Sequence, residues 1–248
     1  MPKPGNDYRP VIEALSHSQI PSVRFKLRLN VLGENPASPA IQELSQAIRH
    51  APQATALLAE RNPQGIIPRN PYEKWRGAHW ALTMLAEIAY PPGDATLIPL
   101  REQVLAWIFS DEIRIRQTQL INGRYRRHAS QQGNLLYYLV KLGLDDPRLE
   151  QVAFDLLEYQ WPDGGWNCDK NPEARNSSFT HSAIALRGLI YYHQKHPDPD
   201  PQIAEAIQRG ADLFLERKLL WRRTTGELIK ADFARLTYPD YHFYTHLL

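Results

Sequence analysis

The chain has 248 residues, of which 43% are apolar and 23% are charged, and its formal net charge at pH 7 is +2. That length allows one domain with a full hydrophobic core, and the near-neutral charge gives no indication of binding to nucleic acid or to an anionic membrane. The single cysteine excludes a disulfide framework within the chain and is typical of a reducing compartment.

We expect neither an export signal nor a membrane-spanning segment in this chain. Its first residues, MPKPGNDYRP, include no apolar run of the kind found in secretory signals, and no stretch approaches the roughly 18 continuous apolar residues of a membrane-spanning helix. We therefore expect a soluble, cytoplasmic protein with no membrane span. No break in composition divides the chain, so residues 1–248 are predicted to form a single domain.

The spacing of the apolar residues predicts helices along the whole chain, whereas the alternation typical of strands is scarce. The N-terminal part, 9–60, is less sharply patterned than the rest. Its expected helices are 9–18, 21–33, 39–51 and 53–60. Six further helices are expected over 79–89, 97–109, 133–143, 149–159, 178–193 and 202–217.

These six helices alternate between two kinds. The first of each pair is apolar on all sides and the second is amphipathic, with the turns YPPGD, GLDDP and HPDPDP between them. Aligning the turns gives a repeat of roughly 50 residues, in which Leu85, Leu139 and Leu189 are equivalent. A helix that is apolar on all sides has to be buried, whereas an amphipathic helix can face water.

The alternation therefore predicts an all-α protein with an inner and an outer layer of helices. Closed on itself, this arrangement is an α/α toroid (barrel) of about five to six helical hairpins. An irregular helical bundle or an open solenoid is the alternative.

Residues 160–169, QWPDGGWNCD, lie between an amphipathic helix and the next apolar one. Gly164 and Gly165 allow a tight turn with positive φ, and Asp163 can cap it. Trp161 and Trp166 can stack on neighbouring helix ends. This stretch is predicted to act mainly as a clasp between successive helix pairs.

A Gln-Trp-x-x-Gly-Gly-Trp stretch before an apolar helix resembles the repeat of the squalene–hopene cyclase, oxidosqualene cyclase and protein prenyltransferase superfamily. The run GGWNCDKNPEARNSSFTHSAIALRGL is also similar to late repeats of protein prenyltransferase β subunits. The resemblance is specific over 123–221 and weaker over 75–109. The N-terminal PSVRF, residues 21–25, is similar to bacterial toroid proteins of the superfamily. The resemblance implies an α/α toroid with a central apolar cavity for an isoprenoid-like molecule.

The chemistry of that superfamily is not reproduced in this sequence. The Asp-x-Asp-Asp motif of the class II cyclases is absent, and Asp198 and Asp200 are expected to be turn residues. Protein prenyltransferases hold zinc with an Asp-x-Cys pair and a histidine. The resemblance places His181 at the histidine but Gln132 and Asn134 at the other two positions, where neither supplies an anionic ligand.

A different metal site is open to this chain. Cys168 and His181 are the candidate metal ligands, and His128 could approach them from the neighbouring repeat. Cysteine and histidine are ligand types that zinc prefers, so zinc is the candidate cofactor. The spacing of the pair fits no common zinc finger, and the alternative is a buried cysteine beside a histidine that caps a turn.

The starts of the predicted inner helices carry His79, His128, His181 and His242. In a toroid these starts converge on one rim, where arginines and aromatic side chains would suit an anionic head group on an apolar tail, such as an isoprenoid diphosphate. The candidate catalytic residues are Asp169, His181, Cys168, His128 and His79. The candidate substrate-binding residues are Arg127, Arg175, Trp166, Trp80, Tyr137 and Phe179. Surface ion pairs and a packed aromatic core are the alternative for these residues.

The leading functional hypothesis is a toroid that binds, and in its enzymatic version converts, an isoprenoid-like hydrophobic small molecule. If cyclisation occurs, Asp169 or Asp163 would be the acid. The rival hypothesis is a non-catalytic toroid that serves as a scaffold for protein partners. Either version allows a homo-oligomer, since an open apolar edge would need a partner.

Overall fold

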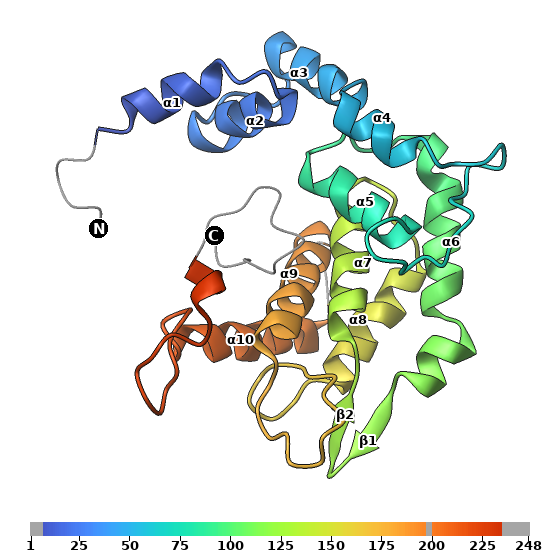
Figure 1. Ribbon diagram of the computed structural model, residues 1–248, viewed down its shortest axis with the longest axis vertical. Coiled ribbons are helices and arrows are strands. Elements are labelled where there is room, and N and C mark those ends of the chain that lie inside the picture. The colour runs from blue at the N-terminus through green and yellow to red at the C-terminus, as the bar shows by residue number, and fades with distance from the viewer. Residues whose placement is uncertain (1–6, 197–199, 235–248) are drawn as a thin grey trace.

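The computed structural model describes residues 7–196 and 200–234 of the chain. Within them the protein is mostly helical, with ten α-helices and one short β-hairpin, as Figure 1 shows. The all-α prediction is therefore confirmed. No helix in these two ranges is both long enough and apolar enough to cross a membrane.

The N-terminal helices are α1 (Arg9–Ser16), α2 (Pro21–Lys26), α3 (Pro39–Arg49) and α4 (Pro52–Leu58). The remaining helices are α5 (Ala78–Glu87), α6 (Ile98–Ile108), α7 (Ala129–Lys141), α8 (Arg148–Glu158), α9 (Phe179–Lys195) and α10 (Pro201–Leu215). Each predicted helix corresponds to one of these ten, although α2 continues as a π-helical turn over Leu27–Val31 rather than as one long helix.

Aspartates in the predicted turns cap the helical segments that follow them. Asp94 accepts a hydrogen bond from the backbone N–H of Thr96 (2.9 Å), and Asp200 caps α10 by accepting one from Gln202 (2.8 Å). A proline in the first turn of α10 cannot donate a backbone hydrogen bond and therefore suits that position. Asp200 is thus a turn residue as predicted, whereas Asp198 lies outside the described residues.

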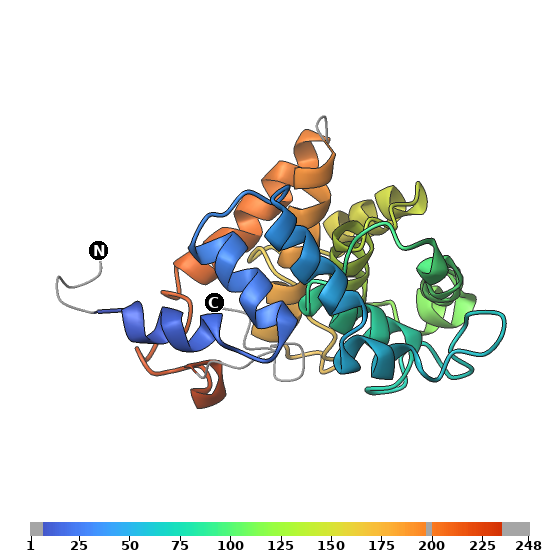
Figure 2. The same cartoon turned by 90° about the horizontal axis from the view of Figure 1, so that it is seen from above.

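The helices from α5 onward form two layers (Figure 2). The inner helices α5, α7 and α9 pack side by side in that order, and α6, α8 and α10 cover them. Every residue of α7 from Ala129 to Leu139 is buried. In contrast, α8 buries one stripe that includes Leu149, Val152 and Leu156. The predicted burial on all sides holds for α5 and for most of α7, whereas α9 buries only one stripe that includes Ile184, Gly188 and Tyr192.

The described helices follow a curved path, from α1 past α4 and α6 to α10 (Figure 1). The N-terminal helices pack mainly on one another, and α4 packs on α5. The described residues contain no packed interface of α1 or α2 with α9 or α10, so the closure of a toroid is not confirmed. His242, the fourth predicted histidine of the rim, lies outside the described residues.

A short antiparallel hairpin precedes α7, with strands β1 (Gln119–Ile121) and β2 (Arg124–Arg126). Its turn is Asn122-Gly123, and both residues have positive φ (51° and 70°). Two positive φ values define the turn that suits the twist of a two-residue hairpin. The hairpin ends two residues before His128 and so aims the chain into the start of α7.

Candidate metal centre

The loop between α8 and α9 is folded by its own hydrogen bonds. The backbone N–H of Trp161 donates to the carbonyl of Gly165 (2.7 Å), and that of Gly164 donates to Trp161 (2.9 Å). Gly164 has φ = +88°, and a β-carbon there would collide with the carbonyl of Arg209. A β-carbon at Gly165 would lie 2.6 Å from Cβ of Ser177. Both glycines are therefore needed, one for its φ and both for close packing.

Side chains of the same loop fasten it to the neighbouring elements. The indole N–H of Trp161 donates to the carbonyl of Tyr125 (2.7 Å), and that of Trp166 donates to a carbonyl of α8 (2.8 Å). The carboxylate of Asp163 accepts hydrogen bonds from the backbone N–H (2.9 Å) and the hydroxyl (2.5 Å) of Ser177. The loop thus has the geometry of the predicted clasp.

Three side chains that can bind a metal meet beside this loop. His128 immediately precedes α7, Cys168 lies in the loop, and His181 lies in the first turn of α9. Their ligand atoms all lie within 4.8 Å of one another. Cys168 Sγ is 3.2 Å from His181 Nε2, and the two imidazole centroids are 5.8 Å apart. The structure therefore brings both predicted metal candidates together with His128.

Backbone contacts hold the three ligands in place. The N–H of Arg127 donates to the carbonyl of Asn167 (3.1 Å), which joins the residues that precede the first imidazole and the thiol. The N–H of Ser178, the residue that caps α9, donates to the carbonyl of Trp166 (2.8 Å). The Ser182 hydroxyl in turn accepts from the N–H of Trp166 (2.9 Å). The ligands are thus positioned on a framework of hydrogen bonds between successive repeats.

Burial sets the protonation of the three ligands. It lowers the pKa of His181 to about 4, with a further contribution from the nearby His128. Burial also lowers the pKa of His128, helped by the charge of Arg127. Both imidazoles are therefore neutral at pH 7, as a metal requires. Burial raises the pKa of the Cys168 thiol, so metal binding there has to release a proton.

Two imidazoles and a thiol match the ligand preference of zinc. A buried ring nitrogen, Nδ1 of His181, makes no hydrogen bond within the described part of the chain. The other ring nitrogen of His181, Nε2, points toward the Cys168 thiol. Within the described residues it has no backbone hydrogen-bond partner, so no backbone group competes with a metal for it. Within residues 7–196 and 200–234 the centre therefore supplies three protein ligands, and their types fit a zinc ion.

Two other candidate catalytic residues are not members of this group. Asp169 is exposed, and its carboxylate accepts a hydrogen bond from the backbone N–H of Asn171 (2.9 Å), as in an Asx turn. His79 is fully buried, with Nδ1 3.2 Å from the Tyr138 hydroxyl, and burial lowers its pKa to about 3. It lies among aromatic rings that include Trp80, 5.1 Å away between centroids. The catalytic roles of both residues stay predictions.

The two predicted anion-binding arginines lie in different environments. Arg127 is buried, and its guanidinium donates to the carbonyl of Ile113, to Thr118 Oγ1 (2.9 Å) and to Gln132 Oε1 (3.3 Å). These bonds already use several of its donors. Arg175 is exposed and pairs only loosely with the equally exposed Glu173 at 3.5 Å.

The predicted substrate-binding aromatics pack within the protein. Trp80 and Trp166 are each only 1% exposed, so both are core residues in the described structure. The ring of Tyr137 lies under the guanidinium of Arg187, 3.9 Å from its centroid. Phe179 packs against the ring of Phe214 at 4.5 Å. Their roles toward a ligand stay predictions.

Gln132 and Asn134, at the two positions where the superfamily has its Asp-x-Cys zinc ligands, form hydrogen bonds to other side chains. Gln132 donates to the buried carboxylate of Asp155 (3.4 Å), and Asn134 accepts from Arg187 (2.9 Å). Both side chains therefore connect helices, consistent with the expectation that they do not bind zinc. The centre in this structure shares only His181 with the site implied by the resemblance.

Two lysines beside the centre were not among the predicted site residues. Lys74 and Lys170 each lower the pKa of His128 by their positive charge. Lys170 follows Cys168 by two positions, so its proximity could have been read from the sequence. Lys74 lies in the loop before α5, and the packing of α5 beside α7 brings that loop to the same side of the protein as His128.

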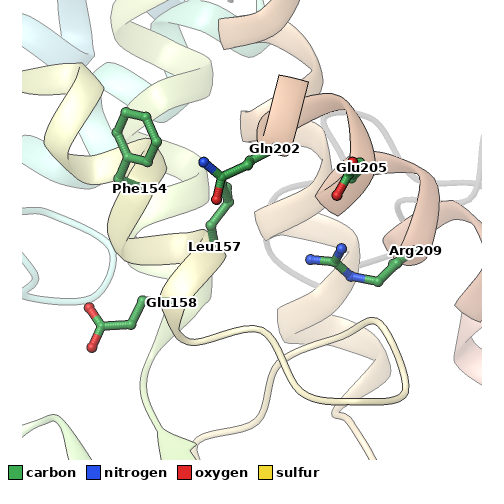
Figure 3. Close-up of a pocket in the computed structure, with 6 residues that line it drawn as sticks. All are labelled: Phe154, Leu157, Glu158, Gln202, Glu205 and Arg209. Atoms are coloured by element: carbon green, nitrogen blue, oxygen red, sulfur yellow. The ribbon is translucent and has the colours of Figure 1, made fainter. Parts of the chain in front are cut away.

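A separate hollow of about 350 Å³ lies between the outer helices α8 and α10 (Figure 3). Phe154, Leu157 and Glu158 come from α8, and Gln202, Glu205 and Arg209 from α10. The hollow is open and combines apolar with oppositely charged groups. It belongs to the outer layer and contains none of the predicted site residues.

Comparison with known proteins gives no match to a family model, to a curated protein or to a solved structure. The resemblance to the cyclase and prenyltransferase superfamily therefore stays a prediction, and the centre has to be interpreted from its own geometry.

Proposed function

We propose that this protein binds one zinc ion through His128, Cys168 and His181 and that the bound ion is catalytic. The observation that carries the proposal is the approach of the three ligand atoms to within 4.8 Å of one another, from the residue before α7, the loop between α8 and α9, and the first turn of α9. Isolated cysteines and histidines are common in proteins. Three half-buried side chains whose ligand atoms lie close together, two imidazoles and a thiol, match the ligands of a zinc site.

The number of ligands found within the described residues, three, favours a catalytic over a structural ion. Structural zinc sites are almost always closed by four protein ligands, whereas catalytic sites have three and keep one position open. When bound in such a site, zinc lowers the pKa of a coordinated water or thiol. The chain itself supplies two neutral imidazoles, a thiol that gives up its proton, and a hydrogen-bonded frame.

The proposal extends to the architecture around the centre. His128 and His181 stand at the same ends of the adjacent inner helices α7 and α9. If the described arc belongs to a closed α/α toroid, the centre lies at the mouth of that ring. An isoprenoid-like hydrophobic molecule bound within the ring would then present one end to the ion. The scaffold hypothesis requires no such site and is favoured if the protein binds no metal.

Metal analysis of the purified full chain tests the proposal. We expect about one zinc per chain by native mass spectrometry and elemental analysis, and a thermal stabilisation that a chelator removes. Cys168→Ala, His181→Ala and His128→Ala should each weaken zinc binding strongly, whereas His50→Ala, which alters an exposed histidine at the end of α3, should not.

Cobalt gives an independent readout, because a thiolate ligand produces a charge-transfer band that Cys168→Ala would remove. Circular dichroism identifies any variant that fails to fold. Zinc binding that is unaffected in the Cys168→Ala/His181→Ala double variant would contradict the proposal. Once metal binding is established, thermal shifts with an isoprenoid diphosphate test the proposed class of ligand.

A further inference from the structure

The segment that follows α10 carries a local concentration of positive charge. Residues 216–230, the basic hairpin, contain five basic and two acidic side chains, a net charge of +3, whereas the whole chain has +2. The remainder of the chain is therefore slightly negative, and the near-neutral total conceals one basic region. In Figure 1 this segment lies at the end of the arc of described helices, beside α10.

Backbone hydrogen bonds fold the basic hairpin and fix which side chains face water. The N–H of Arg222 donates to the carbonyl of Glu227 (2.8 Å), and Trp221 pairs with Leu228 in an antiparallel bridge. The side chains of two such residues project from the same face. Trp221 is 42% exposed and Leu228 is 37% exposed. The hairpin therefore presents an indole ring and an aliphatic side chain together to solvent.

Positively charged side chains surround a hollow beside Trp221. The hollow has a volume of about 510 Å³, and its lining includes Glu216, Arg217, Lys218, Trp221, Arg222 and Arg223. Arg223 forms an ion pair with Glu216 at 2.5 Å, and both side chains are more than half exposed. The other three cations form no ion pair with a carboxylate in residues 7–196 or 200–234. Their charges are therefore not neutralised within the described structure.

We infer that the basic hairpin docks the protein on the surface of an anionic lipid bilayer. Arginine and lysine bind the phosphate groups of lipid headgroups, and tryptophan is suited to the boundary between headgroups and hydrocarbon. Leu215 and Leu219, 63% and 41% exposed, add aliphatic surface in and next to the same segment. This combination of apolar and cationic side chains is typical of segments that bind at a membrane interface. The hairpin contains none of the proposed metal ligands, so the inference is independent of the zinc site.

Nucleic acid is the other polyanion that a basic surface can bind, and the apolar side chains argue against it. Proteins that bind single strands provide aromatic rings on which successive bases stack. Trp221 is the only aromatic residue in 216–230, whereas three leucines lie in the same stretch. An aliphatic side chain gains free energy by leaving water for a bilayer, but it offers a base no stacking surface.

Vesicle sedimentation of the full chain tests the inference. We expect binding to vesicles of phosphatidylcholine with about 30% phosphatidylglycerol, little binding to phosphatidylcholine alone, and weaker binding as salt is added. Lys218→Gln/Arg222→Gln should weaken binding roughly tenfold and Trp221→Ala roughly fivefold, whereas Lys218→Arg should retain it. Arg114→Gln/Arg116→Gln is the matched control, because it removes two exposed cations on the α6 side of the molecule, opposite α10 (Figure 1).

Circular dichroism checks that each variant, which alters only exposed side chains, is folded. The absence of binding to the anionic vesicles, or an equal loss of binding in the control variant, would mean that the basic hairpin does not contact lipid. Tighter binding to a single-stranded oligonucleotide than to the vesicles, lost in Lys218→Gln/Arg222→Gln, would assign the surface to nucleic acid and overturn the inference.

Discussion

Gly133 of α7 and Gly188 of α9 bring the backbones of two inner helices into direct contact. A β-carbon added at Gly188 would collide with the carbonyl oxygen of Gly133, and one added at Gly133 would lie 2.5 Å from Cα of Ala185. The atoms in the way belong to the backbone, which cannot turn aside as a side chain can. This close approach aligns the helix starts that carry His128 and His181.

Gly133→Ala or Gly188→Ala should therefore lower the free energy of unfolding by about 3 kcal/mol, because one methyl group would force two packed helices apart. Urea denaturation followed by circular dichroism measures the change. Each variant should also weaken zinc binding, since the separation of α7 and α9 sets the distance between the two imidazoles.

Gly210→Ala is the matched control for this pair. Gly210 also lies within a helix, but a β-carbon there would meet the end of a flexible side chain, Leu186 Cδ1, at 3.0 Å. The gain in helix propensity, about 1 kcal/mol, should offset most of the crowding. Equal destabilisation by Gly188→Ala and Gly210→Ala would show that the helices are not in backbone contact.

The periodicity of apolar residues predicts the helices of the two layers well, as for α8, expected over 149–159 and observed over Arg148–Glu158. Helix α7 begins at Ala129 rather than near 133. The missed turn contains Gln131 and Gln132, whose polarity indicates a loop, although both are buried. Hydrogen bonding of Gln132 across the helices satisfies its amide, and the sequence does not show that partner.

The candidate site was predictable in its ligand types and only partly in its surroundings. Cys168 and His181 lie close together in the chain, and the repeat brings His128 to them. Lys74 escaped prediction because its approach depends on how the loop before α5 folds. Arg127 has the charge expected of an anion-binding residue, but its burial and its bonds to neighbouring groups could only be seen in three dimensions.

A partly buried ion pair links the first and last inner helices. Arg187 of α9 donates to Glu87 of α5 (2.6 Å) and to Asn134 of α7 (2.9 Å). Glu87→Gln should lower the free energy of unfolding by about 1 to 3 kcal/mol, because a largely buried guanidinium loses its counter-charge. Glu173→Gln, in an exposed pair, should change it by less than about 0.5 kcal/mol. Chemical denaturation measures the free energy of unfolding of both variants. Equal changes would contradict the conclusion that the buried pair contributes more to stability than the exposed one.

The clasp between α8 and α9 should affect metal binding without touching the metal. Asp163→Ala removes both hydrogen bonds to Ser177 and should destabilise the protein by about 1 to 2 kcal/mol. Because the same loop carries Cys168, zinc affinity should fall roughly tenfold, as for other residues that position ligands. Arg175→Ala, an exposed change in the same loop, is the control for both measurements. Unchanged zinc affinity in Asp163→Ala would mean that the thiol is positioned without the clasp.

Stability of the metal-free protein should depend on pH through its buried histidines. The folded-state pKa is about 3 for His79 and about 4 for His181, both lowered from 6.5 by burial. Between about pH 4 and 6.5 the unfolded chain therefore binds more protons than the folded one, so stability is lost as the pH falls through this window. Each histidine contributes a slope of up to about 1.4 kcal/mol per pH unit. Urea denaturation with a chelator at pH 7, 6 and 5 measures this slope. His79→Phe should reduce the slope by the contribution of one histidine, up to about 1.4 kcal/mol per pH unit. A slope that is the same in both proteins would mean that His79 titrates in the folded state as it does in the unfolded chain, and so is not enclosed by the aromatic rings around it.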